Sequence, residues 1–325
     1  MQSLALIVSS DFPPWHNWSF FLVETVNGLT AGSVYALIAL GYSMVYGILK
    51  LLNFAHGDVY MIGAFMGYFA LRGLGGAISP VIDAWLVLLL MFLFAMVVCG
   101  VLGVVIERFA YRPLRNAPRI APLISALGVS FFLESTALLL FSARFRNYDP
   151  NFRLVSFDSG VTIGPVFVSS LRILTVALTL ALMVVLTALV SWTRTGKAMR
   201  ATSFDREAAA MMGIDVDRVI VWTFVIGSAL AGAAGVMFGL VYGQVYHLMG
   251  FNAGLKAFTA AVVGGIGNIP GAMLGGMLIG LAEAFATGYL PQGSTFVDLY
   301  VFSLLIVVML VRPSGLLGTR AIQKV

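Results

Sequence analysis

The sequence predicts an all-α, polytopic integral membrane protein with eight or nine transmembrane or partly re-entrant helices. Its composition is the first observation: hydrophobic residues make up 60% of the 325 residues, and charged residues only 10%. A soluble domain carries about 25% charged residues, and a disordered chain needs low hydrophobicity and high charge. The composition therefore excludes an ordinary globular enzyme and a disordered protein, and we treat residues 1–325 as a single transmembrane domain.

Long apolar runs are the second observation, because a helix needs about 20 apolar residues to cross the hydrocarbon core. Most runs reach that length, one of them with a single acid, Glu134, inside it. The runs cover residues 25–49, 59–71, 84–106, 120–143, 173–192, 219–241, 257–282 and 299–311. The second and the last are short and reach only about 20 Å as helices, so the number of crossings stays open between eight and nine.

Residues 1–24 are predicted to form an N-terminal interfacial segment rather than a signal peptide. No basic residue precedes the first apolar stretch, and Asp11 and two prolines end it early. Trp15 and Trp18 favour a membrane–water interface, where aromatic belts lie. A frayed tail is the alternative.

Positive charge in short loops is the third observation. Alternating crossings place thirteen of the 19 Lys and Arg residues on one side. Because cytoplasmic loops carry an excess of Lys and Arg, we expect that side, with loop 194–218 and the C-terminus, to be cytoplasmic. Arg144, Arg146 and Arg153, in a predicted external loop, are the counter-signal. The thirteen are Lys50, Arg108, Arg112, Arg115, Arg119, Arg194, Lys197, Arg200, Arg206, Arg218, Arg312, Arg320 and Lys324.

Small residues four apart let helices approach closely in lipid, and the chain has several such pairs. With 35 glycines in the chain, some of these pairs arise by chance. The pattern predicts tight helix packing. The pairs are Gly28/Gly32, Gly63/Gly67, Gly235/Gly239/Gly243, Gly271/Gly275 and Gly276/Gly280.

Two polar or glycine-rich breaks interrupt the helical pattern, at residues 53–58 and 264–271, one in each half of the chain. Paired interruptions of this kind point to the substrate site of a transporter, because unwound backbone at membrane depth persists only where protein or water satisfies it. Ordinary cytoplasmic turns are the alternative. The candidate translocation path, which includes one acid within a span, comprises Asn53, His56, Asp58, Glu134, Gly265, Gly267, Asn268 and Pro270.

Residues 200–216 are predicted to form a helix of two to three turns between two crossings. Ser203 can cap its start, Gly213 suits the left-handed residue after its end, and Asp215 can cap the next helix. Alanines and the flexible Met211 and Met212 suit contact with a partner protein. The residues predicted to couple to a partner are Asp205, Glu207, Ala208, Ala209, Met212 and Gly213.

The spacing Glu207-Ala208-Ala209 with Gly213 resembles the EAA-x-x-x-G loop of permease subunits in bacterial ATP-binding cassette (ABC) importers. Five stretches narrow the resemblance to the branched-chain amino acid permease family, over about residues 25–318. The hydrophobic-Leu-Pro element expected after the glycine is absent, which puts the geometry of the loop's exit in doubt. The five stretches are residues 28–37, 53–58, 107–115, 256–271 and 312–318.

The resemblance implies a subunit of a larger importer in the bacterial inner membrane. Such a permease moves branched-chain or similar amino acids into the cell by alternating access. It works with ABC ATPase subunits, a second related permease, identical or different, and an extracytoplasmic amino-acid-binding protein. The sequence agrees that ATP is hydrolysed elsewhere, because Gly196-Lys197 lacks the other residues of a phosphate-binding loop.

Other function classes find less support. Three scattered histidines have no metal-ligand spacing, the basic residues beside apolar runs do not indicate nucleic acid, and no cofactor motif is present. A permease for urea or short-chain amides and an ion-coupled carrier using Glu134, Asp58 or Glu283 are the alternatives. A membrane hydrolase with His56, Asp58 and Ser33 or Ser43 would also need an oxyanion site, which the sequence does not indicate.

Overall fold

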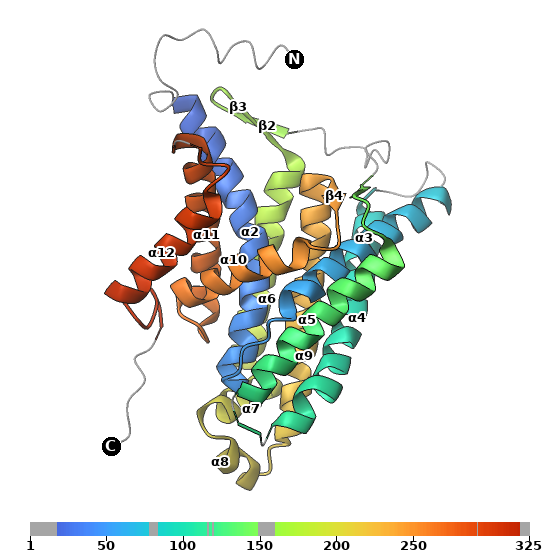
Figure 1. Cartoon of the computed structure of the whole chain (residues 1–325), viewed down its shortest axis with the longest axis vertical. Coiled ribbons are helices and arrows are strands. Elements are labelled where there is room, and N and C mark those ends of the chain that lie inside the picture. The colour runs from blue at the N-terminus through green and yellow to red at the C-terminus, as the bar shows by residue number, and fades with distance from the viewer. Residues whose placement is uncertain are drawn as a thin grey trace.

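The computed structural model describes residues 18–77, 84–115, 117–118, 120–148, 160–290 and 292–318. Long helices dominate it (Figure 1). These are α2 (Trp18–Leu49), α3 (His56–Ala77), α4 (Ala84–Ile106), α5 (Ile120–Phe141), α6 (Ser170–Trp192), α9 (Val216–Tyr242) and α11 (Ile269–Tyr289). The shorter helices are α7 (Arg194–Phe204), α8 (Arg206–Met211), α10 (Met249–Gly264) and α12 (Val297–Val311).

Strands are few and short among the described residues. β2 (Gly160–Ile163) and β3 (Val166–Ser169) form an antiparallel hairpin. β1 (Arg146–Asn147) pairs antiparallel with β4 (Gln244–Val245). The β2–β3 hairpin lies at the end of the molecule opposite α7 and α8 (Figure 1).

Six helical segments in the described part of the chain are long and apolar enough to cross a membrane. The remaining long helix, α3, is not among them, and α10 and α12 are shorter than a full crossing. The all-α membrane class is therefore confirmed, while the count of eight or nine stays a prediction. The six segments are Trp18–Leu49, Trp85–Leu114, Ile120–Phe141, Ser170–Trp192, Val216–Tyr242 and Ile269–Tyr289.

Helix α2 begins at Trp18, seven residues before the predicted start of the first crossing. Nothing between Trp18 and Glu24 breaks a helix, and Phe20 packs edge-on against Tyr289 at the end of α11, with ring centroids 5.2 Å apart. Residues 18–24 therefore belong to the first long helix. The rest of the predicted interfacial segment, together with Arg119, Arg153, Arg320 and Lys324, lies outside the described residues.

The core of the molecule forms where glycines let helices touch. α2 and α11 run antiparallel, with Gly28 beside Leu281 and Gly32 beside Met277. A Cβ on Gly32 would lie 2.8 Å from the Met277 Cα atom, so the backbones are in contact. The predicted tight packing is thus confirmed for this helix pair.

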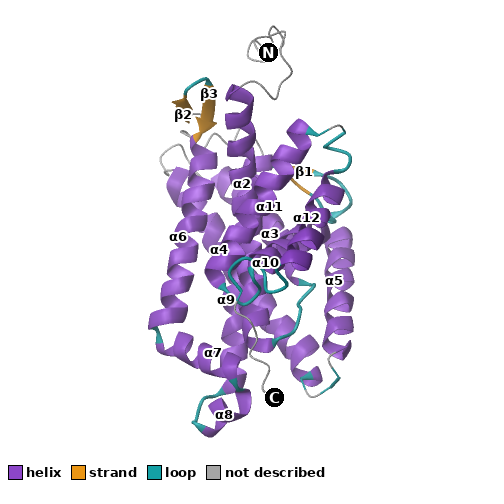
Figure 2. Ribbon diagram, turned by 90° about the vertical axis from the view of Figure 1, so that its left-hand side faces the viewer, coloured by secondary structure: helices purple, strands orange, loops and turns teal. Residues whose placement is uncertain are grey.

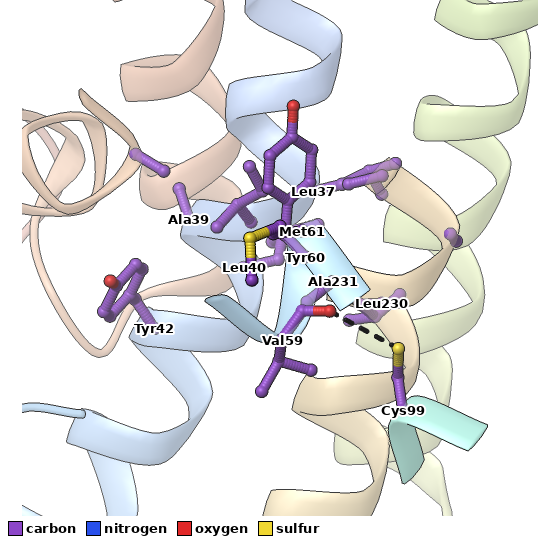
Figure 3. Packing of buried hydrophobic residues seen from close by; sticks show 14 of the residues in the cluster. Leu37, Ala39, Leu40, Tyr42, Val59, Tyr60, Met61, Cys99, Leu230 and Ala231 are labelled. Atoms are coloured by element: carbon purple, nitrogen blue, oxygen red, sulfur yellow. Dashed lines mark hydrogen bonds between the residues drawn. The ribbon is translucent and has the colours of Figure 1, made fainter. Parts of the chain in front are cut away.

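A second close contact joins α3 and α9, and α2 also packs against α9. Figure 3 shows Leu37, Tyr60, Met61 and Leu230 interleaved in this region. The single cysteine, Cys99 on α4, is buried there and its thiol donates to the carbonyl oxygen of Val59, 3.4 Å away (Figure 3). In contrast, α4, α5 and α6 expose large apolar side chains on their outer sides, as lipid-facing helices do.

Candidate translocation path and coupling surface

The segment predicted to contact a partner forms two helices, α7 and α8, rather than one. Asp205 separates them in an extended conformation, and its carboxylate accepts hydrogen bonds of 3.0 Å from the backbone N–H groups of Glu207 and Ala208. Asp205 is therefore the N-cap, and the prediction of Ser203 is wrong. Ser203 ends up in the last turn of α7, because residues 194–204 continue as a helix of their own.

The exit from α8 follows the predicted geometry. Gly213 has φ +82°, a left-handed conformation that favours glycine. The Asp215 carboxylate accepts a 3.0 Å hydrogen bond from the backbone N–H of Arg218 and caps α9, which begins at Val216. The missing Leu-Pro element therefore does not prevent an ordered exit.

The surface of α8 divides into two sides. Glu207 is exposed, and so are Met211 (82% exposed) and Met212 (83%). Ala209 faces the rest of the chain and is buried there, so its predicted contact with a partner stays a prediction. Figure 2 shows α8 standing out at the end of the molecule, next to α7.

Arg206, at the start of α8, contacts the end of α2. Its guanidinium donates to the carbonyl oxygens of Leu49 and of Ile48, the latter 3.3 Å away, and so caps the last turn of α2. Sequence reasoning missed this contact. The available signal was an arginine in the first turn of a helix, where the helix dipole disfavours a positive charge.

A pocket of about 380 Å³ lies beside this contact, between the end of α2, the start of α5 and the turn from α7 to α8. Lys50, Arg115 and Arg206 all line it. Burial and the nearby Arg115 lower the pKa of Arg206. Because this group has an ordinary pKa far above neutrality, Arg206 keeps its charge at physiological pH.

Residues 107–115, one of the stretches that carry the family resemblance, continue α4 as a π-helix, η2 (Glu107–Tyr111), and a 3₁₀-helix, η3 (Arg112–Leu114). Arg115 forms ion pairs with the buried Glu107 and with Asp217 at the start of α9. Arg112 also pairs with Asp217, at 3.0 Å. These ion pairs fix the end of α4 to the start of α9, next to α8.

The first break holds buried polar side chains. Asn53, His56 (1% exposed) and Asp58 (0%) are all inaccessible, so they are not part of a solvated turn. The Asn53 side-chain oxygen accepts from the Tyr111 hydroxyl at 3.1 Å, and Asp58 accepts from Ser130 on α5 at 2.5 Å. These contacts compensate part of the cost of burying polar groups inside the bundle.

Glu134 lies one helical turn beyond Ser130 and is half-buried. It is within electrostatic reach of Asp58 and of His247, which precedes α10. The structure thus brings two predicted path residues, Asp58 and Glu134, near each other from α3 and α5.

The second break is a tight turn between α10 and α11. Gly265 and Gly267 have φ values of +108° and +92°, which other residues rarely adopt. Asn268 caps α11 by accepting from the Gly271 N–H at 3.2 Å, and Pro270 lies in the first turn of that helix. The Asn268 amide also donates to the carbonyl oxygen of Leu317 at 2.7 Å. This hydrogen bond attaches residues 312–318, the C-terminal stretch of the family resemblance, to the turn.

Both breaks meet the same two turns of α2. The His56 ring lies against Gly41 and packs edge-on against Tyr42, with ring centroids 4.9 Å apart. The Ser43 hydroxyl accepts a 2.9 Å hydrogen bond from the Gly267 N–H. The sequence predicted the breaks as a pair, and the structure places the two against residues 41–47 of one helix.

An ion-pair cluster joins α10, α11 and α12. The Lys256 ammonium lies 2.7 Å from a carboxylate oxygen of Glu283 and 3.1 Å from one of Asp298. Sequence reasoning did not find this cluster, because it considered Glu283 only as a single acid and did not pair it with Lys256. Since α10 begins at Met249, Lys256 lies in the middle of a helix.

The serine hydroxyls that a hydrolase would need are engaged elsewhere. Ser33 donates to the carbonyl oxygen of Leu29 at 2.7 Å, and Ser43 accepts from the Gly267 N–H. The His56 ring packs on Tyr42 instead. The arrangement of a nucleophile with its base, which a serine hydrolase requires, is not formed by these residues.

Comparison with known proteins decides the family. The family model for the permease component of branched-chain amino acid transport systems matches residues 24–311. The chain belongs to this permease family. The match covers the coupling segment, both breaks and the ion-pair cluster of α10–α12.

Individual relatives agree with this assignment. The permease is 42% identical over 312 residues to the high-affinity branched-chain amino acid transport system permease protein LivH of Salmonella typhimurium, covering 94% of this chain and 98% of the relative. It is 44% identical over 306 residues to BraD of Pseudomonas aeruginosa, with the same coverage. A probable LivH of Methanocaldococcus jannaschii is 29% identical over 305 residues, 87% of this chain and 88% of the relative.

Proposed function

We propose that this permease carries branched-chain or similar amino acids through the bacterial inner membrane by alternating access, while partner ABC ATPase subunits hydrolyse ATP. The observation that carries the proposal is α8. It is a short exposed helix of a branched-chain permease family member, and Arg206 connects it directly to the central helix α2. The relatives are themselves transport permeases by name.

The proposed coupling step follows the chain of contacts. Closure of the ATPase subunits displaces α8 through its exposed side, which includes Glu207, Met211 and Met212. Arg206 transmits the displacement to the end of α2. The hydrogen bond between Ser43 and Gly267 carries it to the turn that begins α11, so that α2 and α11 tilt together.

The proposed path follows the breaks. Residues Asn53, His56 and Asp58 and the acid Glu134 provide polar groups between α3 and α5, and Gly265, Gly267, Asn268 and Pro270 form the turn below. Asn53, His56 and Asp58 are buried here, as we would expect if the proposed path is closed at that level. A path with few charges suits a substrate that is neutral overall.

The proposed topology has the end with α7, α8 and the tail in the cytoplasm, where most described basic loop residues gather. Helices α2, α3, α4, α5, α6, α9 and α11 cross the bilayer, α10 is partly re-entrant and α12 is a short crossing, which accounts for eight or nine. The other partners are a second related permease and an extracytoplasmic amino-acid-binding protein.

Reversing the charge of Glu207 tests the coupling surface. Glu207→Arg places a positive charge where the ATPase subunits are proposed to bind, so we expect loss of both their co-purification and ATP-driven leucine uptake. Arg144→Glu, an exposed charge reversal at the opposite end, is the control and keeps both. Normal co-purification and uptake for Glu207→Arg would reject the coupling role of α8.

A further inference from the structure

The ion pair between α10 and α11 lies within the bundle rather than at its surface. The side chains of Lys256 and Glu283 are 12% and 21% exposed. Glu283 is six residues from the end of α11, about 9 Å along the helix axis, and α11 is one of the six candidate spans. Charged side chains at such positions are costly and mark substrate or ion pathways by default.

The pair leaves hydrogen-bonding capacity unused. The Glu283 Oε2 atom is buried and has no hydrogen-bond partner within the described residues, while Oε1 accepts from Lys256. The Lys256 ammonium has three N–H donors, and one of its two acceptors, Asp298, is 58% exposed. The cluster therefore presents an acceptor oxygen outside the ion pair, beside a donor that can exchange its partner.

Polar aromatic side chains complete the surroundings of Glu283. The Tyr35 hydroxyl on α2 lies close enough to interact directly with its carboxylate, and Tyr242 at the end of α9 is within electrostatic reach of it. Tyr35 is half-buried and Tyr242 is 46% exposed, so Tyr242 lies between this cluster and the surface of the chain. Four helices, α2, α9, α10 and α11, thus converge on one pair of opposite charges.

We propose that Lys256 and Glu283 together bind the two charged groups of an α-amino acid during transport. The substrate carboxylate accepts from the Lys256 ammonium in place of Asp298, and the substrate ammonium donates to the Glu283 Oε2 atom. A zwitterion matches such a pair because its own charges are adjacent and opposite, and neither protein charge is left unpaired. This inference rests on the proposed function and identifies where within the bundle the substrate backbone binds.

The competing interpretation is a structural one, in which the ion pair simply holds α10 and α11 together. Replacing a structural ion pair by well-packed apolar residues of similar size is often neutral for stability. The double variant Lys256→Met/Glu283→Met therefore preserves a structural contact but removes a zwitterion site. The variants Lys256→Gln, Glu283→Gln and the corresponding double Gln variant remove charge while keeping polarity.

The experiment uses the complete transporter in proteoliposomes with ATP inside and saturating, leucine-loaded binding protein outside. We expect each variant to lower the maximal rate of leucine uptake at least about tenfold, since each removes a hydrogen bond to a charged group. Co-purification of the subunits, the half-saturating concentration of loaded binding protein and its stimulation of ATP hydrolysis stay within about twofold. Arg172→Gln, which removes a half-buried charge bonded to Asn27 on α2, is the control and keeps uptake.

Two outcomes would overturn the inference while the proposed function stands. Full uptake by the double Met variant would show that the charges are not used by the substrate. Failure of both double variants to assemble would show that the pair is needed for the fold itself. If the unaltered transporter moved no leucine, the proposed function would fail instead, so the two failures are distinguishable.

Discussion

At the scale of single residues, two backbone requirements define the coupling segment. Asp205 supplies the side-chain acceptor for the first N–H groups of α8, and Gly213 supplies a φ of +82° at its exit. The glycine was predictable from sequence, because a left-handed residue commonly follows a helix end. The N-cap of α8 was not predictable, because Ser203 and Asp205 both suit an N-cap. Which of them caps the helix depends on where α7 ends.

Gly213→Val tests the exit geometry. A β-branched residue at this φ is strained, at a cost of order 1–3 kcal/mol, so we expect the turn to rearrange and α8 to lose its fixed position. The predicted result is ATP hydrolysis that no longer drives uptake, measured as ATP consumed per leucine transported. Gly213→Asn is the control, because asparagine tolerates the left-handed region. An unchanged ratio of ATP consumed to leucine transported in the Val variant would contradict the proposed role of this turn in coupling.

At the scale of elements, α2 is the helix on which the other features meet. Its last turn accepts the Arg206 guanidinium, its residues 41–47 contact both breaks, and its glycines lie against α11. The glycine pairs and the breaks were visible in the sequence, because small residues and helix interruptions are local signals. Which helix they would meet was not visible, since that depends on packing.

Arg206→Gln tests the contact between α8 and α2. The variant keeps a donor but loses the charge and the reach, so we expect assembly with the ATPase subunits to persist while ATP hydrolysis and uptake become uncoupled. Removing a hydrogen bond from a charged group costs about 1.5–3 kcal/mol, which predicts a severalfold or greater rise in ATP consumed per leucine moved.

Two further variants sharpen this test. Arg206→Lys, which retains the charge, should restore part of the coupling. Arg218→Gln removes an arginine from the same end whose ion pair among the described residues is with its near neighbour Asp215, and should leave coupling unchanged. Equal coupling in Arg206→Gln and the unaltered permease would contradict the proposed link.

Long-range pairing explains what sequence reasoning missed at this scale. Lys256 and Glu283 lie on different helices, 27 positions apart in the chain. Their pairing depends on α10 beginning at Met249, well before the apolar run that marks a span. A half-length helix whose first turn contains Gly250 and Asn252 gives too weak a periodic signal for its start to be located.

At the scale of the whole molecule, the sides of the membrane follow from charge. The residues at the α7–α8 end are predicted to be cytoplasmic, and the β2–β3 hairpin to be external. The chain offers a clean labelling background, because Cys99 is its single cysteine and is buried.

Site-directed labelling tests this orientation. Met211→Cys on α8 should react with a membrane-impermeant maleimide only after the cell membrane is opened, because the residue is 82% exposed but predicted to be inside. Val161→Cys on β2, which is 56% exposed, should react in intact spheroplasts. The reverse pattern would invert the predicted topology.

The central claim is that this permease moves amino acids using energy from ATP hydrolysed by its partners. The most direct measurement is leucine uptake into proteoliposomes that contain the complete transporter, with binding protein outside. We predict uptake that requires ATP inside the vesicles and is unaffected by an uncoupler. Uptake that proceeds without ATP and collapses when an uncoupler removes the ion gradient would contradict the account and indicate an ion-coupled carrier.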